Sequence, residues 1–304
     1  MEMNGGGTGS WEHVAGHSIS SRTYSLYRTL GHDILTDQSW CKQFQVLAVA
    51  LSKAGVTVFV QRSIAFVAEK LSEFTGEKLL IREIGPILNV AAGGDSAGAG
   101  TGSHRSGTFG CLVKDTKKTL YGLSCDHVVG ALAGQSGGDA VWSPGKARGG
   151  TSKSKIGEFK RGSGVVLSTS SSNRVDGALI DLDKPSAHAQ SINGIPGAPT
   201  GVNRSISFGD ALKKSGVATG VTSGQFSYIV TMNVPYTGGQ ARFVDQIGID
   251  GGGVVFADQG DSGAVVLDDS NKVVGLLFCA APQSCLGFAN FIDEVEVELG
   301  VTVV

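Results

Sequence analysis

The chain has 304 residues, a net charge of −2, and 41% hydrophobic against 17% charged residues. This composition is typical of a globular protein with a large core, and it excludes a disordered chain. The charge gives no reason to expect nucleic acid or an anionic membrane as a partner. No apolar stretch approaches the roughly 18 residues that a membrane-spanning helix needs.

The cysteines and the first residues bear on the compartment. Five cysteines make an odd number, and no CxxC pair or cysteine–histidine cluster indicates a zinc site. The opening MEMNGGGTGS has neither the basic start nor the apolar segment of a signal peptide. We therefore expect a cytoplasmic, reducing environment, with no metal and no other cofactor.

The first third of the chain predicts a leader and a small domain. Residues 1–35 are polar and glycine-rich, and we expect a flexible leader there. Beyond them, large apolar residues at helical spacing predict an amphipathic helix that ends at Gly55; they are Trp40, Phe44, Leu47 and Leu51. A strand is expected over 56–60, a second helix over 63–74 and a second strand over 78–84. These elements predict a small α+β N-terminal domain over 36–88. Its apolar helix faces are expected to pack on the following domain of the same chain, on a neighbouring subunit of a homo-oligomer or on an activating protein partner.

Residues 89–106 are small and glycine-rich, which predicts a linker. From residue 107 to 304, short β-branched runs alternate with turn residues, and glycine reaches 46 in the whole chain. Such a pattern predicts a mainly β domain, built as two small barrels or a sandwich. The expected strands are 108–114, 120–130, 154–160, 164–169, 176–182, 224–234, 252–257, 263–269 and 273–280. Residues 291–301 predict a closing helix, although their alternation of valine and glutamate also fits a strand.

Three polar residues in this β-rich part are candidates for chemistry. Ser262 lies between Gly260 and Gly263, which leave the backbone clear for two N–H groups that could hold an oxyanion. A serine hydroxyl needs a base to become a nucleophile, and the base needs a carboxylate to orient it. His127 and Asp176 are the candidates. Taken singly, each is more often a structural or surface residue.

The order His127, Asp176, Ser262 resembles the chymotrypsin-like (trypsin-fold) serine peptidases. The resemblance covers about residues 107–301 and rests on three blocks of sequence. They are GTFGCLVKDTKKTLYGLSCDHVVG, VDGALIDL and GDSGAVVLDDSNKVVGLLF, which are similar to the family's histidine, aspartate and serine blocks. More closely, the layout resembles non-secreted bacterial and plant trypsin-like proteins with an N-terminal extension. The resemblance selects the two-barrel alternative.

The resemblance implies a serine endopeptidase that hydrolyses protein or peptide substrates through an acyl-enzyme. Ser262 would be the nucleophile, His127 the general base and then acid, and Asp176 the orienting carboxylate. The backbone N–H groups of Gly260 and Ser262 would form the oxyanion hole. The substrate pocket would include Phe256 at its floor and Phe278, Cys279 and Ala280 in its wall. An uncharged floor implies small or medium apolar residues before the cut, unless Asp258 turns inward and favours a basic one.

Three features depart from the family pattern. The disulfides of the secreted members are missing, and we expect Cys111 and Cys125 to be reduced core residues, with a cross-hairpin disulfide as the alternative. No cleavage site is evident that would supply a new N-terminus for Asp261, so Asp261 needs another partner or the site is switched in another way. Finally, two further acids compete with Asp176; they are Asp181 and Asp183.

Other functions fit the sequence less well. An esterase of the α/β-hydrolase type needs a GxSxG motif, but Ala264 occupies the last position. A cysteine nucleophile at Cys125 would lie too close to His127 along one strand. His13 and His17 lack a third metal ligand. The serious alternative is a catalytically silent trypsin-fold scaffold that binds peptides or protein partners.

Overall fold

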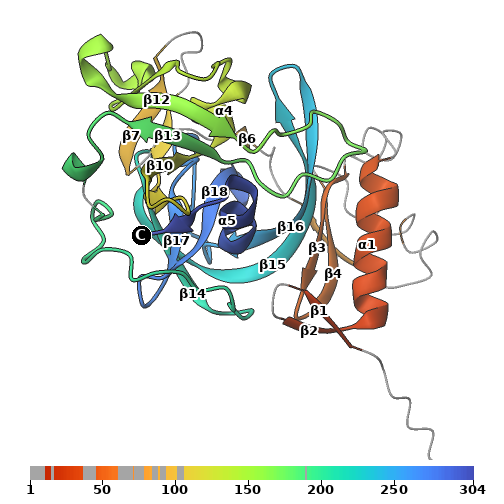
Figure 1. Cartoon of the computed structure of the whole chain (residues 1–304). Coiled ribbons are helices and arrows are strands. Elements are labelled where there is room, and N and C mark those ends of the chain that lie inside the picture. The colour runs from red at the N-terminus through yellow and green to blue at the C-terminus, as the bar shows by residue number, and fades with distance from the viewer. Residues whose placement is uncertain are drawn as a thin grey trace, which may run out of the picture.

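The computed structural model describes residues 11–14, 17–36, 46–60, 71, 79–83, 88–89, 94–100, 106–188 and 190–304. Within these ranges most of the regular structure is β, arranged in two large curled sheets (Figure 1). No described helix is long and apolar enough to cross a bilayer. The expected mainly β, two-barrel fold is confirmed.

The N-terminal part begins with a hairpin and a helix. β1 (Trp11–Val14) pairs with β2 (His17–Ser20), and α1 (Ser21–Thr36) follows directly. The expectation of a flexible leader over 1–35 is wrong for this helix. Its polar sequence carries an apolar stripe at helical spacing, which packs inward; the buried members are Tyr27, Leu30, Ile34 and Leu35.

The helix expected up to Gly55 is also wrong where the structure describes it, because residues Val46–Ser52 form strand β3. β3 forms an antiparallel hairpin with β4 (Gly55–Val60), and β5 (Leu80–Glu83) pairs parallel to β4. The strands expected over 56–60 and 78–84 are thus confirmed. Side chains on both faces of β3 are buried, so its sequence lacks the alternation of apolar and polar residues that marks a half-exposed strand. Of the helix expected over 63–74, only Leu71 lies among the described residues.

The first barrel is an eight-stranded sheet in the order β20-β9-β10-β13-β12-β11-β7-β8. The expected hairpin around residues 115–119 and the strands near 154–160 and 176–182 are confirmed. The linker expected over 89–106 is wrong for residues 95–99, because they form strand β7, which pairs with both β8 and β11. The strands are β7 (Asp95–Ala99), β8 (Gly107–Phe109), β9 (Leu112–Lys114), β10 (Leu120–Ser124), β11 (Ala140–Trp142), β12 (Lys155–Gly162), β13 (Ala178–Leu182) and β20 (Thr302–Val303).

The second barrel is built on a sheet in the order β14-β17-β18-β19-β16-β15-β3-β4-β5. The hairpin β3–β4 therefore extends this barrel through β15, and β6 (Leu88–Asn89) pairs separately with β18. Two expected strands, 164–169 and 252–257, are irregular, and the long strand β16 was not expected from the sequence. The strands are β14 (Ala211–Gly216), β15 (Gly220–Tyr236), β16 (Gly239–Asp250), β17 (Val265–Asp268), β18 (Val273–Ala281) and β19 (Leu286–Phe291).

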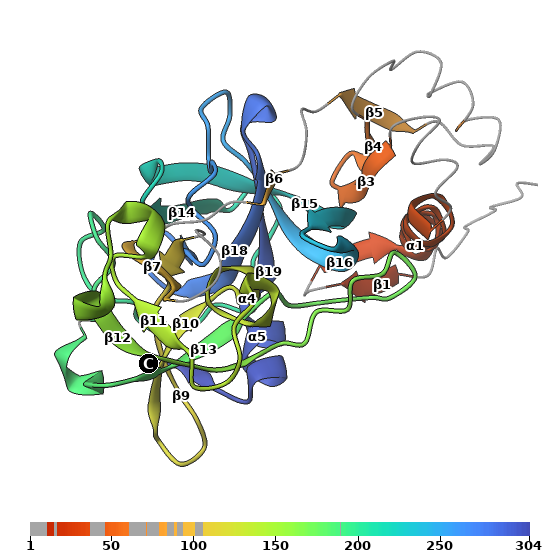
Figure 2. The same cartoon turned by 90° about the horizontal axis from the view of Figure 1, so that it is seen from above.

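Short helices complete the fold. α5 (Ile292–Leu299) confirms the expected closing helix, and α4 (Asp126–Val129) follows β10. Figures 1 and 2 show α1 beside the β3–β4 hairpin, on the far side of β15 from the first barrel. The 3-10 turns are Ala131–Ala133, Lys146–Arg148, Ser152–Ser154, Pro185–Ala187 and Pro282–Ser284. Side chains of both barrels join in one apolar core, which fixes the seam between them.

Candidate active site

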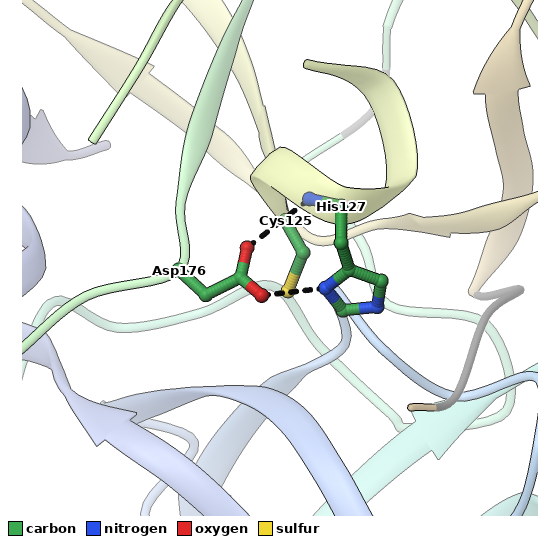
Figure 3. Close-up of side chains that lie close together, drawn as sticks. All are labelled: Cys125, His127 and Asp176. Carbon is green, nitrogen blue, oxygen red and sulfur yellow. Dashed lines mark hydrogen bonds and ion pairs between the residues drawn. The ribbon is translucent and has the colours of Figure 1, made fainter. Parts of the chain in front are cut away.

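A buried histidine–aspartate pair lies at the end of the first barrel. His127 is on α4, immediately after β10, and Asp176 lies just before β13. His127 Nδ1 is 2.6 Å from Asp176 Oδ2, and both side chains are almost fully buried (Figure 3). The turn from β10 into α4 also directs two backbone N–H groups at this carboxylate. Asp126 N–H and His127 N–H donate to Asp176 Oδ1 at 2.8 and 3.2 Å.

The second barrel also holds Asp176. The hydroxyl of Tyr236, at the end of β15, donates to Asp176 Oδ2 at 2.7 Å, and its ring lies edge-on to the His127 ring. Asn290 on β19 accepts the backbone N–H of Asp176, and its amide donates to Gln246 Oε1 on β16. The carboxylate is therefore positioned by contacts from both barrels.

The charge state of Asp176 follows from these contacts. Burial by itself would raise the pKa of Asp176, but the nearby His127 and the hydrogen-bond donors outweigh burial, and the pKa lies below its ordinary value. An ionised carboxylate accepts hydrogen bonds only, so His127 Nδ1 must carry a proton. The other ring nitrogen, Nε2, is then the basic one in the neutral ring. The pKa of Tyr236 is raised by burial and by Asp176, which keeps its hydroxyl a donor.

The loop that carries Ser262 is held against the first barrel. Thr108 on β8 donates its N–H to Ser262 O at 2.7 Å and its hydroxyl to Asp261 O at 3.0 Å. Gly263 has φ +95°, and a Cβ at this position would lie 2.4 Å from Thr108 O and 2.7 Å from Ser124 Oγ. Only glycine fits such a close approach at positive φ. Glycine at 263 is therefore a structural requirement of the seam.

The same seam brings the segments of His127 and Ser262 together. Ser124 contacts the Gly263 position, and Cys125 Sγ donates to Leu277 O at 3.3 Å. Ser262 Oγ itself donates to the carbonyl oxygen of the next residue, Phe278, at 2.9 Å. Ser262 has 0% and His127 1% of its surface exposed.

The two backbone groups expected to form an oxyanion hole lie in a tight turn. Gly260 has φ +142°, a conformation that favours glycine, and Asp261 N–H donates to Asp258 O at 3.0 Å. Neither Gly260 N–H nor Ser262 N–H donates to an acceptor among the residues that the structure describes. Buried amide groups of this kind are normally paired. They are suited to bind the oxygen of a ligand.

Asp261, next to Ser262, has a buried cationic partner. Lys214 Nζ on β14 is 3.2 Å from Asp261 Oδ2, and both side chains have no exposed surface. Burial lowers the pKa of Lys214, and the charge of Asp261 opposes this shift. The remaining oxygen sites of Asp261 accept from four donors, namely the N–H groups of Ala218, Thr219 and Asp258 and the hydroxyl of Thr219.

The expected pocket residues gather on the second barrel but are closed to solvent. All four of them have 0% of their surface exposed; they are Phe256, Phe278, Cys279 and Ala280. The Phe256 ring packs on Gly287, where a Cβ would lie 2.5 Å from Phe256 Cδ1. Lys214 Nζ lies 6.0 Å from the centre of this ring. Asp258 Oδ1 accepts the N–H of Gln259, so its carboxylate is held in the local turn.

The competing acids and the cysteines take other positions. Asp181 pairs with Lys160 at 2.9 Å and Asp183 with Lys155 at 3.5 Å, on the exposed face of the first barrel. Neither appears among the partners of His127 that the structure describes. The described cysteines are free thiols, including the hairpin pair; they are Cys111, Cys125, Cys279 and Cys285.

Cys125, His127 and Asp176 lie within 4.8 Å of one another through possible ligand atoms (Figure 3). Burial, followed by the charge of Asp176, raises the pKa of Cys125, and its thiol donates to a backbone carbonyl. A metal would require the thiolate. Asp176 Oδ2 is also taken by His127 and Tyr236. This cluster does not fit a metal.

Few local sequence signals point to the residues that support the site. Tyr236 and Asn290 reach Asp176 through contacts across 60 and 114 positions, which no local pattern reveals. One local pattern does indicate a buried lysine near Lys214. Adjacent residues in a strand point to opposite faces, so one of Lys213 and Lys214 had to point inward.

No protein-family model matches the chain, and no curated protein matches it. Among solved structures, it is similar to a glutamic-acid-specific serine protease that uses a histidine triad in substrate binding. The TM-score is 0.50 and the identity 19%, over 70% of this chain and 99% of that one. The fold is that of the chymotrypsin-like serine peptidases.

Two further solved structures are similar to the chain but score slightly lower. Nocardiopsis protease has a TM-score of 0.46 and 15% identity, over 71% of this chain and 99% of its own. Thermobifida fusca protease A has a TM-score of 0.48 and 17% identity, over 71% and 98%. The resemblance expected from the three sequence blocks is confirmed at the level of this fold.

Proposed function

We propose that the protein is a serine endopeptidase in which Ser262, His127 and Asp176 act together. The observation that carries the proposal is the buried pair of His127 and Asp176, 2.6 Å apart, on the barrel end that packs against the Ser262 loop. Burying a carboxylate next to an imidazole is costly unless every group is satisfied. Sites with such an arrangement are often functional.

The proposed reaction starts at Ser262 Oγ. Its oxygen attacks the carbonyl carbon of a peptide bond while its proton passes to His127 Nε2. The N–H groups of Gly260 and Ser262 stabilise the oxyanion that forms. When the C–N bond breaks, His127 returns the proton to the leaving amine and the acyl group remains on Ser262. Water, activated by the same ring, then hydrolyses the ester.

A productive serine must first leave its present partner. Ser262 Oγ donates to Phe278 O, whereas the proposed reaction needs it to donate to His127 Nε2. The proposal therefore includes a change of the Ser262 side-chain rotamer, and rotamers of exposed side chains exchange within nanoseconds. Asp176 already fixes the ring by its hydrogen bond to Nδ1, so the proposed base is pre-oriented for this change.

The proposed preference is for small or medium apolar residues before the cut. All four proposed pocket residues are uncharged, and the Phe256 ring packs on Gly287 at the floor. Cleavage of a peptide library that varies this position tests the preference. Strong selection of lysine, arginine or glutamate before the cut would contradict it.

The experiment that tests the function is labelling with a small fluorophosphonate, which phosphonylates an activated serine and releases fluoride. We expect an adduct on Ser262 in the full chain and none in Ser262→Ala, with both proteins unfolding at the same urea concentration. His127→Ala should slow labelling by at least about a hundredfold, because general-base assistance is worth roughly that much. A folded wild-type protein that gives no adduct and cuts no peptide would refute the proposal.

A catalytically silent scaffold is the second candidate. It is favoured by one observation, the hydrogen bond that turns the Ser262 hydroxyl toward Phe278 O. If the protein is a scaffold, the wild type and the Ser262→Ala variant should bind a peptide with equal affinity, and neither protein should cut it. The same labelling experiment therefore decides between the two functions.

A further inference from the structure

One edge of β18 is shared by the Ser262 loop and a distant part of the chain. Along this edge, Leu276 pairs with β17, and Leu277 exchanges backbone hydrogen bonds with residues 263 and 264. Phe278 O then accepts the Ser262 hydroxyl. The next two residues, Cys279 and Ala280, pair with β6 (Figure 2). β6 thus occupies the first edge positions beyond the serine.

The pairing has the geometry of a bound peptide. β6 is antiparallel to β18, with Ala280 opposite Leu88 and Cys279 opposite Asn89. Its chain direction therefore runs along the edge toward Phe278 and Ser262. An extended peptide that added to this edge would make main-chain hydrogen bonds to the same stretch of β18, as in other cases of strand addition. The other edge of β18 is taken at these positions by β19.

The exposure of the site agrees with an occupied edge. Cys279 and Ala280 have no exposed surface, and neither does Ser262. A peptide from solution needs these groups to be accessible before its carbonyl carbon can approach the serine oxygen. In the described arrangement, the edge that would receive its backbone is already filled by Leu88–Asn89.

The occupant is tied to the barrel by short connections. Four residues, 84–87, separate it from the end of β5 at Glu83, and β7 begins at Asp95. β5 belongs through β4, β3 and β15 to the same sheet as β18. A short tether of this kind gives a segment a high effective concentration, on the order of millimolar, at its own binding site.

We propose that Leu88–Asn89 is an intramolecular competitor that occupies the edge of β18 reserved for the backbone of a peptide substrate. The inference rests on the proposed function and adds its regulation. A peptide in solution must displace this strand before it can bind. Long peptides are therefore cut more slowly than they would be if the edge of β18 were free. The recognised chemistry is an extended main chain, since both contacts are backbone pairings.

Two double variants of the full chain test the proposal. Leu88→Pro/Asn89→Pro removes both N–H groups of β6, and proline cannot donate in a ladder. Leu88→Ala/Asn89→Ala is the matched control, because it changes the same side chains and keeps both N–H groups. We expect kcat/KM for a tetrapeptide amide to rise about tenfold in the proline variant relative to the alanine control. Only one of these two adjacent N–H groups faces β18, and the loss of one backbone hydrogen bond is worth about two- to tenfold.

The outcomes separate this inference from the proposed function. If Ser262 forms a fluorophosphonate adduct but the proline and alanine variants cut the peptide equally fast, the competitor is refuted and the endopeptidase stands. If no variant forms the adduct or cuts, the proposed function fails. A proline variant that unfolds at lower urea than the control is replaced by the following measurement on the wild type.

Hydrogen exchange with a bound aldehyde needs no substitution. The probe is the peptide aldehyde Ile-Leu-Asn-Val-H, whose sequence repeats residues 87–90. Ser262 Oγ adds to its aldehyde carbon and forms a hemiacetal. Adjacent residues of a strand direct their N–H groups to opposite sides, so one of Leu88 and Asn89 donates to β18. We expect this amide to exchange at least about tenfold faster once the probe is bound, because the probe takes its edge. Unchanged exchange at both amides, with the hemiacetal formed, would overturn the proposal.

Discussion

The buried pair of Lys214 and Asp261 gives the most direct test of how the Ser262 loop is held. Asp261 precedes the serine, and its carboxylate fixes the turn that contains Gly260. Lys214→Met keeps the length and packing of the side chain and removes the charge. The variant then leaves a carboxylate buried without its cation, while Thr219 Oγ1 and Gly220 O lose a donor.

The magnitude follows from the contacts. Breaking a buried ion pair from one side costs about 3–5 kcal/mol, because an uncompensated charge remains. Asp261 retains its four other hydrogen bonds, so we expect the lower limit, about 3 kcal/mol. Lys214→Met/Asp261→Asn leaves no buried charge at the pair and should recover about 2 kcal/mol of that loss. The two single variants and the double variant form a cycle that isolates the pair.

Urea unfolding gives the free energies, and the rate of fluorophosphonate labelling reports on the loop. If Ser262 N–H loses its orientation in Lys214→Met, labelling should slow by about a hundredfold, the usual cost of one oxyanion donor. A variant within about 0.5 kcal/mol of the wild type, labelled at the wild-type rate, would refute the role of Lys214 in positioning the loop.

Three further predictions concern the same seam. Tyr236→Phe removes one donor to Asp176 and keeps the ring, so kcat/KM for a peptide amide should fall about tenfold, as for a hydrogen bond to a charged group; an unchanged kcat/KM would contradict it. Burial and Asp176 raise the pKa of Asp126 from 3.8 to about 6, so the folded protein binds this proton more tightly than the unfolded chain, and stability falls as pH rises from about 4 to about 6. Asp126→Asn should therefore gain up to about 3 kcal/mol on the wild type between pH 4 and pH 7 in urea unfolding, and a gain independent of pH would refute the assignment. Gly263→Ala should lower the unfolding free energy by at least about 3 kcal/mol, since its Cβ meets Thr108 O at positive φ. Gly134→Ala, measured by the same urea unfolding, is the control, because its φ is also positive but its Cβ meets nothing within 4 Å.

Much of the second half of the fold could be predicted because its signals are local. Short β-branched runs between turn residues gave most strands of both barrels, and glycines on both sides of Ser262 marked a loop with special backbone geometry. His127 and Asp176 were proposed as a pair from their order along the chain. The structure places them in contact, while their roles in a reaction stay predictions.

The rest depended on contacts that no short window contains. β3 is apolar on both faces because α1 and the barrel cover it, so its period could not separate strand from helix. β6 has only two residues, and its pairing with β18 joins positions about 190 apart. The same applies to Lys214 and Asp261, 47 positions apart by their numbers, since charge pairing is decided by the fold.

The pairing of β3 with β15 has a practical consequence. β3 lies opposite residues 229–232 of β15, which are almost fully buried. A shortened protein that began at the glycine-rich stretch after residue 88 would present these backbone groups and apolar side chains as an open sheet edge. Open edges of this kind recruit other chains. Such a truncation would accordingly aggregate or form dimers through strand exchange, and the isolated barrels are unsuited to serve as a shortened form of the protein.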